Sequence, residues 1–164
     1  MTEPTSAAEV LELLDRSGRT LAVAESLTGG MLAAAIVEVP GASSAFRGGI
    51  VAYATELKSA LLEVDPALLA ARGPVDPDVA SQMAAGVRAR MGADVGVSTT
   101  GVAGPDPQDG RAPGTVYVAV DVAGGPSRVL ALVLPGDRGD VRAATVRTAL
   151  DLLGECLVGS WEQG

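Results

Sequence analysis

Short apolar segments typical of buried strands alternate with amphipathic helical segments along the chain, and two adjacent strand-like segments then follow. Strands are predicted at residues 20–26, 48–54 and 94–100, with a hairpin of residues 115–122 and 127–134 around Gly-Gly-Pro. The alternation of strands with helices along the chain favours parallel strands covered by helices on both faces, whereas the hairpin adds antiparallel strands. The pattern predicts an α/β fold: a single three-layer α/β/α domain with a mixed β-sheet, spanning residues 1–164 with its core at about 5–158.

Several helix boundaries carry their own signals. Ser6 and Glu9 have the spacing of a capping box. Asp65 and Asp76 each precede a proline, as an N-cap residue often does. Thr55 is expected to cap the helix that follows the second strand. A long final helix is predicted from about residue 140 to 158.

Composition limits the classes of partner. The chain has 164 residues, 48% of them hydrophobic, and a net charge of −8, so a nucleic-acid or anionic-membrane partner is not expected. The N-terminus lacks the pattern of a signal peptide, and no apolar run approaches the ~20 residues of a membrane span. The single cysteine, Cys156, lies in an apolar rhythm and is predicted to be a core residue. Together these features predict a cytoplasmic protein.

Histidine is absent and no CxxC motif occurs. The usual ligands of transition metals are therefore missing, and neither a metal nor another cofactor is expected.

Three segments could bind an anion or a polar ligand. In AESLTGG (residues 24–30), a strand leads through a turn into a helix, so Thr28, Gly29 and Gly30 could offer N–H groups to an anion. The alternative is a simple helix cap by Ser26 or Thr28. In STTGVAGPDPQDGRAPGT (residues 98–115), Thr100 and Gly101 follow a strand, and ligands often bind at such strand ends. The second half of this loop could instead be a disordered connector.

The start of the final helix contains the third candidate. Arg138 and Arg142 lie in its first turns, where the helix dipole disfavours cations by about 0.3–1 kcal/mol each. Either neighbouring aspartates neutralise these arginines, or the guanidinium groups face an anionic ligand.

Lys58 is the only lysine among twelve basic residues. Arginine stays protonated at working pH, whereas a desolvated lysine can lose its proton and act as a base. A serine–lysine pair is one known variant of the serine triad, and Ser43 and Ser44 lie in the same stretch, PGASSAFRGGIVAYATELK. The alternative is that an arginine-rich composition retains one surface lysine by chance.

Four motifs, AESLTGG, PGASSAFRGGIVAYATELK, STTGVAGPDP and GTVYVAV, occur in this order, and with them the chain resembles the CinA C-terminal domain family. That family includes nicotinamide-nucleotide amidohydrolases. The resemblance covers roughly residues 5–158 and implies the stand-alone form, without the additional N-terminal domain of full-length members.

The resemblance implies metal-independent hydrolysis of the carboxamide of nicotinamide mononucleotide, a step of pyridine nucleotide recycling. It places the nucleophile at Ser43, with Ser44 as the alternative, the base at Lys58, and Tyr53 beside them. It assigns Ser26, Thr28, Thr100 and Arg138 to the substrate pocket, and it implies a homo-oligomer. The alternatives are a non-catalytic nucleotide-binding domain and an interaction domain linked to competence or DNA damage.

Overall fold

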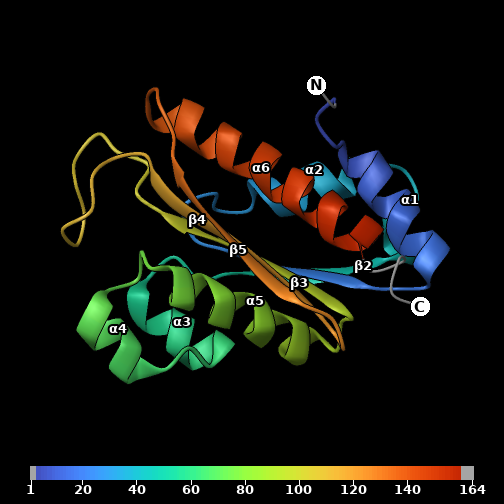
Figure 1. Cartoon of the computed structure of the whole chain (residues 1–164), viewed down its shortest axis with the longest axis horizontal. Helices are drawn as coiled ribbons and strands as arrows, with labels where there is room; N and C mark the ends of the chain where they lie inside the picture. The colour runs from blue at the N-terminus through green and yellow to red at the C-terminus, as the bar shows by residue number, and fades with distance from the viewer. Residues whose placement is uncertain (1–2, 160–164) are drawn as a thin grey trace.

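The computed structural model, described here for residues 3–159, contains a five-stranded sheet between two layers of helices (Figure 1). The strand order is β2-β1-β3-β4-β5. β1 pairs in parallel with β2 and β3, whereas β3–β4 and β4–β5 are antiparallel. The strands are β1 (Leu21–Glu25), β2 (Phe46–Val51), β3 (Val95–Gly101), β4 (Thr115–Val122) and β5 (Ser127–Val133).

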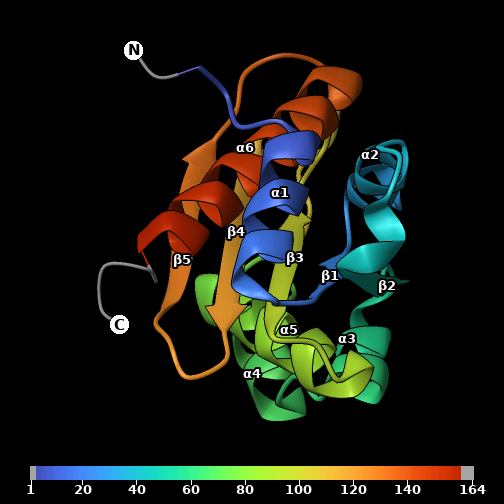
Figure 2. The same ribbon diagram turned by 90° about the vertical axis from the view of Figure 1, so that its right-hand side faces the viewer.

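The helices divide between the two faces of the sheet (Figure 2). One layer holds α1 (Ala7–Ser17), α2 (Met31–Val37) and α6 (Arg138–Gly159), and the other holds α3 (Thr55–Leu62), α4 (Pro66–Arg72) and α5 (Pro77–Met91). A short 3₁₀ helix, η1 (Ala42–Ser44), precedes β2. The predicted three-layer α/β fold with a mixed sheet is confirmed.

Most of the predicted caps are present. The Ser6 and Glu9 side chains form the capping box of α1, and the carboxylates of Asp65 and Asp76 accept N–H groups at the starts of α4 and α5. The expectation for Thr55 is wrong. Thr55 is already the first residue of α3, and Ala54 precedes it as an N-cap without a side-chain hydrogen bond.

Close packing holds α5 against the sheet. A Cβ atom at Gly96 of β3 would lie 2.0 Å from the carbonyl oxygen of Ala84 in α5, so only glycine fits there. Separate apolar clusters fill the two faces of the sheet, and Cys156 lies in the cluster beneath α6, as predicted. Within residues 3–159, no helix is both long enough and apolar enough to cross a bilayer.

The strand directions bring three loops together. Because β1, β2 and β3 are parallel, their carboxyl ends lie at the same edge of the sheet. The loops that leave this edge comprise residues 26–30, 52–54 and 102–114. Residues 40–45 precede β2 and so lie at its opposite end.

Candidate active site

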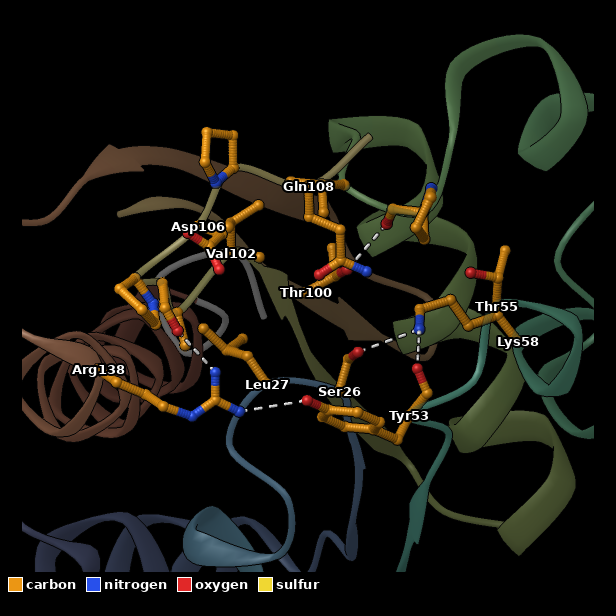
Figure 3. A pocket seen from close by; sticks show the side chains of 17 residues that line it. Ser26, Leu27, Tyr53, Thr55, Lys58, Thr100, Val102, Asp106, Gln108 and Arg138 are labelled. Carbon is orange, nitrogen blue, oxygen red and sulfur yellow. Dashed lines mark hydrogen bonds between the residues drawn. The ribbon is translucent and has the colours of Figure 1, made fainter. Parts of the chain in front are cut away.

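A cavity of about 330 Å³ opens at the carboxyl ends of β1, β2 and β3 (Figure 3). Side chains from all three following loops line it, together with residues of α3 and the first residue of α6. Its lining includes two cationic side chains, Lys58 and Arg138, and one carboxylate, Asp106. Its position agrees with the rule that ligands of open α/β sheets bind at carboxyl ends of strands.

Lys58 is the largest of the fully buried side chains, with 1% of its surface exposed. Its ammonium group donates to the hydroxyl oxygen of Ser26 at 3.0 Å, to the carbonyl oxygen of Ala52 at 2.8 Å and to that of Tyr53 at 3.4 Å. Burial lowers the pKa of Lys58 to about 8, and the carboxylates of Glu56 and Asp109 oppose part of this shift. A lysine in this environment can exchange its proton near neutral pH.

Ser26 follows the last residue of β1 and is held by β3. Its backbone N–H donates to the carbonyl oxygen of Thr99 at 3.0 Å. The β1–β3 pairing therefore determines where Ser26 lies, and the β2–α3 connection brings Lys58 to it. Figure 3 shows the Ser26 hydroxyl directed toward the Lys58 amine.

Tyr53 and Arg138 form another side of the cavity. One guanidinium nitrogen of Arg138 donates to the Tyr53 hydroxyl at 3.2 Å, and the other donates to the carbonyl oxygen of Gly104 at 2.8 Å. Arg138 thus links the start of α6 to the β2–α3 connection and to the loop after β3 (Figure 3). The aspartates near Arg138 do not bond it; Asp137 and Asp140 bond each other's backbone N–H groups.

Thr100 and Gly101 line the cavity, as expected from their place at the end of β3. The Thr100 hydroxyl donates to the carbonyl oxygen of Pro74 at 2.8 Å and so anchors the loop before α5. A Cβ atom at Gly101 would lie 2.7 Å from the carbonyl oxygen of Thr115, so no side chain fits there.

Thr28, Gly29 and Gly30, which the sequence proposed as substrate contacts, are not among the residues that line the cavity. Thr28 is fully buried, and its hydroxyl group bonds Glu25 at 2.6 Å and Thr99 at 2.8 Å. Gly29 and Gly30 have φ values of 55° and 105°, which residues with a side chain rarely adopt, and they turn the chain into α2. This segment shapes the turn beneath Ser26.

The second half of the loop of residues 102–114, for which a disordered connector was the alternative, contains a hydrogen-bonded turn. Gln108 and Arg111 exchange two backbone hydrogen bonds, of 3.0 and 2.8 Å. Asp109 and Gly110 between them have φ values of 50° and 75°, the left-handed conformation that tight hairpin turns require. The residues before this turn, through Gln108, line the cavity.

The expected pair of Ser43 and Lys58 is not formed. Ser43 lies in η1 before β2, whereas Lys58 follows β2, so the strand separates them. Ser43 is exposed beside an apolar hollow lined by Val37 and Phe46. The hydroxyl oxygen of Ser44 lies 2.8 Å from a carboxylate oxygen of Asp15 and 2.9 Å from the carbonyl oxygen of Gly41, and it can donate its hydrogen to either. The serine to which Lys58 donates a hydrogen bond is Ser26.

Comparison with known proteins gives the family. A family model described as the CinA C-terminal domain matches residues 3–157. The chain belongs to the CinA C-terminal domain family. This match covers nearly the whole described part of the domain, including every residue that lines the cavity.

Relatives of this CinA C-terminal domain have similar sequences and structures. A "CinA-like protein" of Frankia casuarinae is 54% identical over 92% of this chain and 34% of its own length. A "putative competence-damage inducible protein" of Geobacillus is 38% identical over 94% of this chain and 37% of its own length. The chain thus spans about a third of the length of these relatives. A competence-damaged protein (CinA) superfamily crystal structure from Klebsiella pneumoniae has a TM-score of 0.89 and 32% identity, covering 93% of this chain and 96% of that chain.

Proposed function

We propose that this domain hydrolyses the carboxamide of nicotinamide mononucleotide to nicotinate mononucleotide and ammonia, with Ser26 as nucleophile and Lys58 as general base. The observation that carries the proposal is the 3.0 Å hydrogen bond between the buried Lys58 amine and the Ser26 hydroxyl inside the cavity. A serine hydroxyl needs an adjacent base to become a nucleophile. Lys58 is the residue of this cavity that is hydrogen-bonded to Ser26 and can serve as that base.

The surroundings of Lys58 suit this role. With a pKa of about 8, roughly a tenth of the amine is neutral at pH 7. The neutral amine has two hydrogens and one lone pair. The carbonyl oxygens of Ala52 and Tyr53 can accept the two hydrogens, which directs the lone pair toward the Ser26 hydroxyl.

The reaction then proceeds in two stages. The Ser26 oxygen attacks the carboxamide carbon while its proton passes to the Lys58 amine. The Lys58 ammonium group returns this proton to the amide nitrogen, the C–N bond breaks, and ammonia leaves an ester of nicotinate mononucleotide on Ser26. Water then attacks the ester carbon and gives a proton to Lys58, and Ser26 leaves as the alcohol with that proton.

The developing negative charge on the carbonyl oxygen requires hydrogen-bond donors. Leu27 directly follows the nucleophile and lines the cavity. Within residues 3–159, its backbone N–H forms no hydrogen bond. Residues directly after a nucleophilic serine provide such donors in other hydrolases.

The cavity supports an anionic, small-molecule substrate. Its volume of about 330 Å³ is at the lower end of the ~300–1,000 Å³ range of ligand sites. Arg138 at its rim, with its fork of donors, suits a phosphate group. The resemblance of the motifs to amidohydrolases of the family supports the choice of nicotinamide mononucleotide among such substrates.

Ammonia release from nicotinamide mononucleotide tests the proposal, with nicotinate mononucleotide identified by mass spectrometry. We expect turnover that a chelator leaves unchanged. Binding of the mononucleotide without turnover would instead favour a nucleotide-binding domain. Neither binding nor turnover would contradict both assignments.

A further inference from the structure

Three consecutive hydroxyl side chains, Ser98, Thr99 and Thr100, lie buried near the carboxyl end of β3. Successive side chains of a strand point to opposite faces of the sheet. The Ser98 hydroxyl donates to the carbonyl oxygen of Ala80 in α5 at 2.6 Å, and that of Thr100 bonds the loop before α5. Thr99 points to the other face, where its hydroxyl oxygen lies 2.8 Å from that of Thr28.

The backbone N–H of Ser26 is shared between two oxygen atoms of Thr99. It lies 3.0 Å from the carbonyl oxygen and 3.4 Å from the hydroxyl oxygen. One N–H can be shared between two acceptors in this way. The pairing of β1 with β3 ends at Glu25 and Thr99, so these contacts extend the support of β3 to the residue that follows β1.

The Glu25 carboxylate fixes the direction of the hydrogen bonds among these side chains. This buried group accepts the backbone N–H groups of Leu32 and Ala33 at 2.8 and 3.1 Å, and the Thr28 hydroxyl donates to it at 2.6 Å. A hydroxyl group has one hydrogen to donate. In the contact between the two threonines, Thr99 is therefore the donor and Thr28 the acceptor.

The hydroxyl hydrogen of Thr99 consequently points away from Ser26, and its oxygen offers a lone pair to the Ser26 N–H. A directed hydrogen-bond chain results, in which each group donates to the next: the Ser26 N–H, Thr99, Thr28 and the carboxylate of Glu25. All four residues are buried. Hydrogen bonds in such surroundings are stronger than in water and reinforce one another along a chain.

The rest of the turn after Ser26 has a separate support. The guanidinium group of Arg142 in α6 donates to the carbonyl oxygens of Leu27 and Thr28, at 2.9 and 3.3 Å. Loss of the Thr99 hydroxyl should therefore move Ser26 without unfolding this turn.

We infer that Thr99 is a positioning residue: its hydroxyl group fixes the backbone at Ser26 and so holds the Ser26 hydroxyl within hydrogen-bonding distance of Lys58. The inference rests on the proposed role of Ser26 as nucleophile. Neither Thr99 nor Thr28 is among the residues that line the cavity. Loss of the hydrogen-bond chain thus displaces the nucleophile and leaves the substrate contacts in place, so that kcat falls and KM changes little.

Thr99→Val tests the inference, because it removes the hydroxyl group and keeps a β-branched side chain. A displacement of about 1 Å can cost about 100-fold in rate, so we expect kcat for nicotinamide mononucleotide to fall by about 10- to 100-fold with KM nearly constant. Thr99→Ser retains the hydroxyl group and should keep most of kcat. Thr145→Val is the matched control, because the buried Thr145 hydroxyl donates to the carbonyl oxygen of Val141 in its own helix, outside the cavity. It should change neither constant.

A double-mutant cycle with Thr28→Val tests the hydrogen-bond chain itself. Thr28→Val removes the acceptor that orients the Thr99 hydroxyl, so it should lower kcat by a similar factor. Because both changes break the same chain, the double variant should be no slower than the slower single variant. Thermal unfolding of each variant gives the folded fraction, by which kcat is corrected.

Four results would overturn the inference: unchanged kcat in folded Thr99→Val, a change confined to KM, losses that multiply in the double variant, or a loss fully explained by unfolding. An equal loss of kcat in Thr99→Ser would do the same, since that variant retains the hydroxyl group.

Labelling of Ser26 by a fluorophosphonate separates this inference from the proposed substrate. The serine oxygen displaces fluoride from phosphorus whatever the natural substrate is, so labelling should be slower in Thr99→Val than in Thr145→Val. Equal labelling rates would contradict the role of Thr99 and leave Ser26 as the nucleophile. Absence of labelling in the unmodified protein would contradict the role of Ser26 itself, and with it the inference.

Discussion

The amine of Lys58 lies 3.0 Å from the hydroxyl oxygen of Ser26, although the two residues are 32 positions apart in the chain. Ser26 directly follows strand β1, and Lys58 enters from α3 after the neighbouring strand β2. Both side chains are buried, so solvent competes little for their hydrogen bond. The predictions below follow from this contact and from the charges around it.

Replacing Ser26 should abolish the reaction, and replacing Ser43 should not. Ser26→Ala removes the nucleophile, which can cost about 10⁶-fold in kcat, while binding of the mononucleotide remains measurable by calorimetry. Ser43→Ala is the matched control, because Ser43 is exposed and lies beyond the opposite end of β2. The reverse result would restore the assignment that the sequence resemblance implied.

Lys58→Arg should remove most of kcat while keeping the positive charge. Arginine does not release its proton at working pH, so it cannot accept the proton of Ser26. We expect at least a 1,000-fold decrease, roughly the contribution of a general base, in steady-state assays. Circular dichroism should confirm that the variant is folded. Near-normal turnover in a folded Lys58→Arg protein would refute the Ser26–Lys58 mechanism.

The activity of the unmodified enzyme should rise with pH. The reactive form contains neutral Lys58, so kcat/KM should increase through an apparent pKa of about 8 and level off above it. Glu56, exposed on the surface of α3, raises the pKa of Lys58. Glu56→Gln should therefore shift the midpoint of the profile to lower pH, by an amount that decreases with added salt. A pH-independent rate would exclude Lys58 as the titrating base.

Stability should also depend on pH because of Lys58. The pKa is about 8 in the folded protein, against a value of 10.5 without burial. Between these values the unfolded chain binds more protons, so the free energy of unfolding rises with pH, by up to about 3 kcal/mol. Lys58→Met should lack this rise. Urea titrations of both proteins at pH 7 and pH 10 measure the difference; parallel pH dependences would show that Lys58 is not desolvated.

Arg138→Ala should weaken binding of the mononucleotide more than it slows chemistry. Loss of a charge-assisted contact costs about 1.5–3 kcal/mol, so KM should rise by roughly 10- to 100-fold. Free nicotinamide, which has no phosphate group, should be a poor substrate for both proteins and show little difference between them. If Arg138→Ala slowed the reactions of both substrates equally, the role of Arg138 would instead be structural, through its hydrogen bonds to Tyr53 and Gly104.

The fold could be predicted from local patterns because each element carries a strong signal. Alternation identified the strands, and the dipeptides Asp65-Pro66 and Asp76-Pro77 marked helix starts that the structure confirms. The predicted N-cap at Thr55 is wrong because α3 begins at Thr55 itself, so the capping position falls on Ala54. The hairpin at Gln108–Arg111 was missed, although its Asp-Gly pair is a recognised turn signal.

The site could be predicted only in part. Lys58 stood out by composition, and Thr100, Gly101 and Arg138 line the cavity as expected. The resemblance placed the nucleophile at Ser43, whereas the hydrogen bond of Lys58 goes to Ser26. In parallel strands, residues after β1 and β2 meet at one edge, so Ser26 was the serine of the motifs that could reach Lys58.

Two backbone hydrogen bonds join the start and the end of the loop of residues 102–114, which lines the cavity. Gly114 donates to Val102 at 2.8 Å, and Val102 donates to Thr115 at 2.9 Å. These bonds close the base of the loop, so the pairing of β3 with β4 does not depend on the residues between Pro105 and Pro113. We therefore expect this closed base to accept loops of other lengths and sequences. The lining of the cavity could therefore change without altering the sheet that positions Ser26 and Lys58.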